Sequence, residues 1–78
     1  MNVTDNFTQD ELRTYFTWLD NLRESASVNM FGAYPLLASE FGLAADQARA
    51  VWSAWAQTFH GRLTAARRVE QLFQQAGL

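Results

Sequence analysis

Several residue types that build covalent or catalytic sites are missing or scarce in this chain. It has no cysteine, no lysine, one histidine and one proline among 78 residues. Without cysteine, disulfides and thiolate zinc sites are excluded, and a lone histidine with scattered carboxylates does not make a transition-metal site. No apolar run approaches the length that spans a bilayer, and no basic segment precedes an apolar one near Met1. We therefore expect a protein of the cytoplasm with no membrane segment and no metal.

Catalytic groupings are also absent from the sequence. The four serines have no neighbouring residues that would activate a nucleophile, and no glycine-rich phosphate loop occurs. The carboxylates Asp10 and Glu11 are explained by helix capping, so no pair is left for acid–base chemistry. His60 stands beside Gly61, where a helix C-terminus is expected to hold it. The prediction is a non-enzymatic protein that uses no cofactor.

What the chain does have is apolar and aromatic residues, with an uneven distribution of charge. Hydrophobic residues make up 49% and aromatic residues 14%, enough for one folded domain over residues 1–78. The net charge is −2. Residues 1–40 hold six carboxylates and two arginines, whereas residues 41–78 hold two carboxylates and four arginines. The second half is therefore the only place where a basic face is expected.

Periodicity predicts an all-α fold, a compact bundle of about four helices. Thr8 and Glu11 form a capping box, and apolar residues recur at helical spacing from Leu12 to about residue 24. A one-turn helix is expected at about 30–33 and a second helix at 35–41, which Gly42 ends. Two further helices are expected at 45–59 and from about 63 to 76, with a break at Gly61 favoured over one continuous helix.

The segment 35–59 resembles a helix-turn-helix unit. Ala38 supplies the small residue, Gly42 the turn, Leu43 the apolar residue after it, and Ala48 with Val51 the inner face of the second helix. In a DNA reader the second helix lies in the major groove. The resemblance then implies base contacts and phosphate contacts from six residues: Gln47, Arg49, Ser53, Arg62, Arg67 and Arg68. An acidic chain without lysine makes DNA the second choice of partner.

A second resemblance covers residues 12–59. The runs Asn29-Met30-Phe31-Gly32-Ala33 and Glu40-Phe41-Gly42-Leu43 look like those of short uncharacterised proteins from phages and prophages, although Ala26 and Ala44 depart from that pattern. The resemblance implies a mobile-element source and a bacterial host cytoplasm. Small proteins of this kind commonly bind a host or phage protein, as inhibitors or regulators.

The aromatic excess favours the same interpretation. Tryptophan and tyrosine are enriched at binding hot spots, although large side chains also fill the core of a small bundle. The candidate partner-binding residues are Trp18, Met30, Phe31, Tyr34, Trp52 and Trp55. A homodimer is a further hypothesis, with the apolar stripe from Leu63 to Phe73 as its second face. The leading prediction is a protein-binding module, and the alternative is a helix-turn-helix transcriptional regulator.

Overall fold

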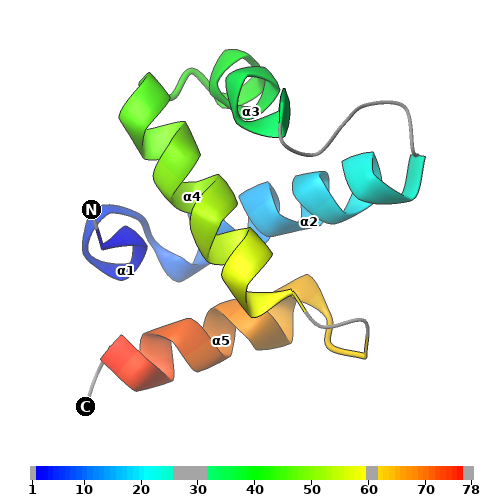
Figure 1. Ribbon diagram of the computed structural model, residues 1–78. Helices are drawn as coiled ribbons and strands as arrows, with labels where there is room; N and C mark the ends of the chain where they lie inside the picture. The colour runs from blue at the N-terminus through cyan, green and yellow to red at the C-terminus, as the bar shows by residue number, and fades with distance from the viewer. Residues whose placement is uncertain (1, 26–31, 60–61, 77–78) are drawn as a thin grey trace.

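The chain folds into helices alone wherever the structure describes it. The computed structural model describes residues 2–25, 32–59 and 62–76, and these segments contain no strand. The helices are α1 (Val3–Asn6), α2 (Gln9–Ser25), α3 (Ala33–Phe41), α4 (Ala45–Thr58) and α5 (Ala65–Ala76). In Figure 1, α4 crosses α2, α3 lies against the first half of α4, and α5 runs below α2. The all-α prediction is confirmed.

The first two helices are each capped by a residue with a short polar side chain, Asn2 before α1 and Thr8 before α2. Thr8 N–H donates to Glu11 Oε1 at 2.8 Å and Glu11 N–H donates to Thr8 Oγ1 at 3.1 Å, so the predicted capping box is present at the start of α2. The single-turn helix α1 was not predicted. The side chain of Asn2 caps it by accepting from Thr4 N–H at 3.1 Å, which satisfies a donor that a helix start leaves free.

The turn between α3 and α4 depends on Gly42. Its φ of 66° lies in the left-handed region, which side chains disfavour and glycine adopts readily. Leu43 N–H then donates to Ala38 O at 3.0 Å and closes the helix end. Helix α3 begins at Ala33, two residues before the predicted start at Pro35. Proline is tolerated there because the N–H groups of a first turn have no intrahelical partner.

A break separates the last two helices, as expected. Phe59 leaves α4 in an extended conformation with ψ 128°, and α5 begins at Ala65. Leu63, expected near the start of the last helix, lies before it, because Thr64 caps α5 by accepting from Arg67 N–H at 3.2 Å. The roles predicted for His60 and Gly61 lie outside the described residues, as does the first half of the short turn expected at about 30–33.

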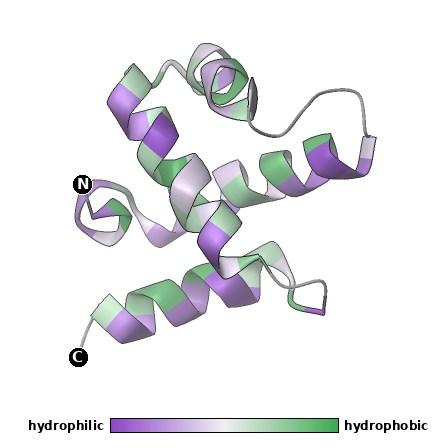
Figure 2. Ribbon diagram, in the orientation of Figure 1, coloured by the Kyte–Doolittle hydropathy of each residue, from purple (hydrophilic) through white to green (hydrophobic). Residues whose placement is uncertain are grey.

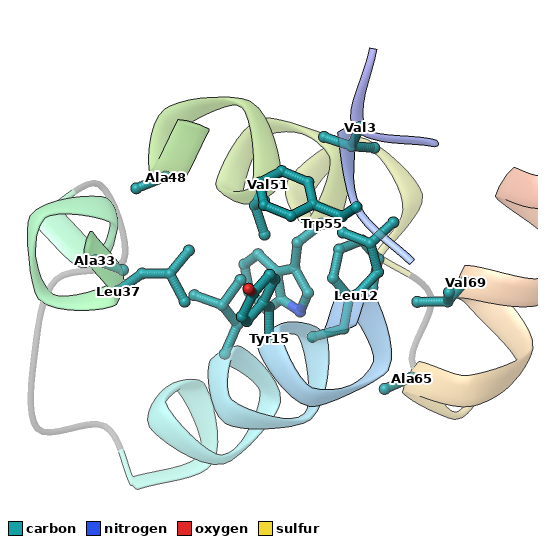
Figure 3. Packing of buried hydrophobic residues seen from close by; sticks show 13 residues of the cluster. Val3, Leu12, Tyr15, Ala33, Leu37, Ala48, Val51, Trp55, Ala65 and Val69 are labelled. Atoms are coloured by element: carbon teal, nitrogen blue, oxygen red, sulfur yellow. The ribbon is translucent and has the colours of Figure 1, made fainter. Parts of the chain in front are cut away.

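One apolar cluster joins all five helices. Figure 3 shows Leu12, Tyr15, Leu37, Val51 and Trp55 pointing toward one another between α2, α3 and α4. Val3 from α1 and Val69 from α5 belong to the same cluster, so both peripheral helices share the core. Each longer helix carries hydrophilic as well as hydrophobic stretches (Figure 2). Among the helices described, none is long and apolar enough to cross a membrane.

Candidate functional site

The outward face of α4 forms the floor of an open groove. The inward face of this helix is set by Ala48, Val51 and Trp55, all buried. On the other side, a groove of about 860 Å³ opens between α4, the start of α1 and the second half of α5. Its lining residues are Asn2, Val3, Asp46, Arg49, Ala50, Ser53, Ala54, Gln57 and Leu72.

Small side chains make this groove, and its polar groups are of mixed kind. Ala50, Ser53 and Ala54 are half-buried and follow the i, i+3, i+4 spacing that places them on one helix face. Asp46 and Arg49 are the two charged lining residues, and both lie in the first half of α4. The Ser53 hydroxyl accepts from Gln57 Nε2 at 3.2 Å. The groove therefore offers shallow apolar contact with one charge of each sign at one end.

Arg49 is held in place from the neighbouring helix. Its Nη2 donates to the Tyr34 hydroxyl at 2.9 Å, and its guanidinium carbon lies 5.0 Å from the centroid of that ring. The Tyr34 ring lies 6.4 Å from the Trp52 ring, and both aromatic residues are half-buried. These three side chains join α3 to α4 beside the groove, and they include two of the predicted partner-binding residues.

Gln47, predicted to read a base edge, is engaged at the start of its own helix. Ala44 is the N-cap of α4 and has no side-chain acceptor. Gln47 Oε1 accepts from the Ala44 N–H at 3.0 Å, so half of a capping box is made without the other half. A base contact would require Gln47 to give up this bond.

Arg68 was predicted to hold a phosphate, and the structure contradicts this. Arg68 is 1% exposed. Its Nη1 donates to Asp20 Oδ1 at 3.1 Å, and its Nε donates to the Thr58 carbonyl at 3.0 Å. Nη2 donates to the Trp55 carbonyl. Burial lowers the pKa of the guanidinium and the carboxylate of Asp20 opposes that shift. An enclosed cation with these partners is not available to DNA.

Trp55 is likewise an interior residue and not a surface contact. It is 4% exposed, and its indole Nε1 donates to Asp20 Oδ1 at 2.8 Å. Trp18 is half-buried on α2, where its ring lies 5.9 Å from Phe41. Met30 and Phe31 fall outside the described residues. Of the four predicted partner-binding residues that the structure describes, Trp55 is therefore not available at the surface.

Asp20 joins α2 to α4 and α5, a role that the sequence analysis did not assign to it. Its Oδ1 accepts from the Trp55 indole and from Arg68 Nη1. Arg23, on the same helix, lies over the Phe59 ring, 4.3 Å from its centroid. Asp20 follows Phe16 by four residues, and Arg68 stands between Ala65 and Val69 in the apolar stripe of α5. A charged residue on each of two apolar stripes was the signal for a buried pair.

The exposed arginines of the second half do not form one basic surface. Arg49 lies in the second turn of α4, and Arg62 and Arg67 follow the C-terminal end of that helix (Figure 1). The helix rises by about 13.5 Å over the nine steps from Arg49 to Thr58, at about 1.5 Å per residue. Arg67 is exposed at the start of α5. The six residues predicted to contact DNA are thus divided between a helix face, a helix end and the interior.

Comparisons with known proteins add no family. The chain matches no protein-family model, no curated protein sequence and no solved structure. Within the described segments, no group of three or more histidine, aspartate or glutamate side chains is placed to hold a metal ion.

Proposed function

We propose that this protein is a non-catalytic module that binds a protein partner through the groove along α4. The observation that carries the proposal is the groove itself, which has a floor of small residues, apolar walls from Val3 and Leu72, and one charge of each sign. Large apolar side chains of a partner fit into such a surface, and the mixed charge at one end orients them. Helix-in-groove recognition uses surfaces of this kind.

The shape and charge of α4 favour protein over DNA as the partner. A recognition helix reads DNA by entering the major groove, which requires a helix that projects from its domain. Here the outward face of α4 is flanked by Val3 and Leu72, and among the described residues that line it Arg49 is the one cation. Affinity for DNA comes mainly from neutralised phosphates, and the chain as a whole has a net charge of −2.

The same shape disfavours a homodimer across this groove. A two-fold interface brings the same surface of both copies together, so the surface must be complementary to itself. Two concave grooves facing each other leave unfilled space. The apolar stripe of the last helix, expected as a second dimer face, has Ala65 and Val69 buried within the chain's own core. The partner is accordingly a different protein that presents a convex element.

The source and setting follow from the sequence resemblance. We propose an origin in a phage or prophage, a location in the bacterial cytoplasm, and a host or phage protein as partner. The resemblance that supports these proposals covers residues 12–59, which include all of α4 but neither α1 nor Leu72.

The test is to capture partner proteins with the wild type and with a variant in which a large side chain fills the groove. Tagged protein and its Ser53→Trp variant are each used to capture proteins from bacterial lysate, and bound proteins are identified by mass spectrometry. Ala56→Trp is the matched control, since Ala56 is exposed on the same helix and does not line the groove. A protein retained by the wild type and by Ala56→Trp but lost from Ser53→Trp supports the proposal. Equal retention by all three contradicts it.

The DNA alternative has its own assay. A salt-dependent mobility shift with duplex DNA that Arg49→Ala abolishes supports a regulator, because Arg49 is the exposed cation on α4. We expect no shift at low salt.

A further inference from the structure

Helix α5 packs on the rest of the protein through a few apolar residues and one buried cation. Its buried residues are Ala65, Arg68 and Val69, and Leu72 and Phe73 are half-buried. The largest fully buried side chain of the whole core is therefore a charged one that α5 contributes. In Figure 1 this helix lies at one edge of the bundle, below α2.

Arg68 also completes the C-terminal end of α4. The last four carbonyls of a helix have no intrahelical donor, and in α4 two of these belong to Trp55 and Thr58. Arg68 donates to both carbonyls, and its Nη2 lies 3.4 Å from Thr58 Oγ1. A cation is also favoured at this negative end of a helix. The last turn of α4 and the docked position of α5 thus depend on the same side chain.

The guanidinium sits between helices that are far apart in sequence. Its carbon lies 5.2 Å from the Phe16 ring, 5.6 Å from the Trp55 ring and 5.2 Å from the Phe59 ring. Asp20 from α2 supplies the counter-charge. If α5 moves away, all of these contacts are lost together, because they converge on one planar group.

The contacts of Arg68 fix the position of α5 on the other helices but contribute only modest net stability to the fold. Removing a guanidinium and a carboxylate from water offsets much of the attraction between them. An apolar residue at this position would leave the Trp55 and Thr58 carbonyls and the Asp20 carboxylate without the donors that Arg68 supplies. The buried apolar side chains of α5 are Ala65 and Val69, which are smaller than the four that α2 buries, Leu12, Tyr15, Phe16 and Leu19.

We propose that α5 and the last turn of α4 form one conformational unit that opens more readily than α2, and that the contacts of Arg68 hold this unit closed. Opening withdraws Leu72 from the wall of the groove and changes its shape. That consequence rests on the proposed function, whereas the opening itself does not.

Native-state hydrogen exchange tests the opening. Exchange of backbone amides is followed residue by residue in the wild type, in Arg68→Met and in the control Arg67→Met, which removes an exposed charge from the next position. We expect amides of α5 and of residues 55–58 to share one exchange free energy, with protection roughly tenfold or more below that of α2. Because the Arg68 contacts are lost both in this opening and in global unfolding, Arg68→Met lowers protection of the two segments and of α2 by a similar factor, about 30- to 160-fold, whereas Arg67→Met changes neither.

Two results overturn the proposal. The first is exchange of α5 at the same free energy as α2, which means that α5 opens only in global unfolding. The second is protection of α5 and of residues 55–58 that Arg68→Met leaves unchanged, which means that the opening does not break the Arg68 contacts. If Arg68→Met does not fold, Asp20→Asn replaces it, because asparagine keeps an oxygen for the Trp55 indole; the same loss is then expected, smaller in size. Neither readout involves a partner, so failure here is separate from failure of the groove proposal.

Discussion

The interior pair of Arg68 and Asp20 allows a prediction of stability from named contacts. Arg68→Met removes the donors to Asp20 and to the Trp55 and Thr58 carbonyls while keeping a long side chain. Breaking a buried ion pair from one side costs about 3–5 kcal/mol. The Asp20 side chain is 28% exposed and can be rehydrated, and methionine regains contact with the surrounding rings. We therefore expect a loss of about 2–3 kcal/mol, or roughly 30- to 160-fold in the unfolding equilibrium.

Urea unfolding followed by circular dichroism measures this loss. A chain of 78 residues has a total stability of about 4–12 kcal/mol, so the variant loses a large part of it. With a slope of about 1 kcal/mol per molar urea, the midpoint falls by about 2–3 M. Arg67→Met, the exposed neighbour, should stay within about 0.5 kcal/mol of the wild type. If Arg68→Met unfolds at the midpoint of Arg67→Met, the interior network contributes no net stability and the reasoning is refuted.

Three further predictions concern the turn, the cap of α4 and a buried phenol. Gly42→Ala should cost about 1–2 kcal/mol because its φ is 66°, whereas Gly32→Ala, with φ −94° and open space around it, should be nearly neutral in the same urea assay. Ala44→Asp should raise stability by about 0.5–2 kcal/mol by supplying the missing acceptor, which thermal unfolding detects and an unchanged midpoint contradicts. Burial, followed by the charge of Glu11, raises the pKa of Tyr15 in the folded state. The contribution of Tyr15 to stability is therefore complete at pH values below its unfolded-state pKa, near 10, and is lost as the pH rises through its folded-state pKa. Tyr15→Phe should flatten that alkaline decline, and an unchanged slope would show that other groups cause it.

Local signals predicted most of the helices. The Thr8–Glu11 capping box, the glycine at position 42 and the apolar spacing all act within a few residues, so they are readable without the fold. Helix α1 escaped prediction because its four residues are too few to show periodicity. The early start of α3 escaped because proline was treated as the first helical residue when it is the third.

The candidate site was less predictable, because it depends on which helices meet. Arg68 and Trp55 were assigned to surfaces from residue type alone, yet Asp20, 48 and 35 positions away, brings both into the interior. The groove combines residues from α1, α4 and α5 that share no motif. Small residues such as Ala50 and Ala54 give no signal in a sequence, and only their placement between Val3 and Leu72 makes them the floor of a groove.

The proposal that the groove binds a protein is tested most directly by measuring one captured partner against three forms of the chain. Binding of the purified partner by isothermal titration calorimetry should be retained in Ala56→Trp and reduced by more than about tenfold in Ser53→Trp, since a hot-spot contact is worth 2 kcal/mol or more. Circular dichroism of both variants confirms that the helices are intact. Undiminished binding by a folded Ser53→Trp protein would contradict the groove as the site of recognition.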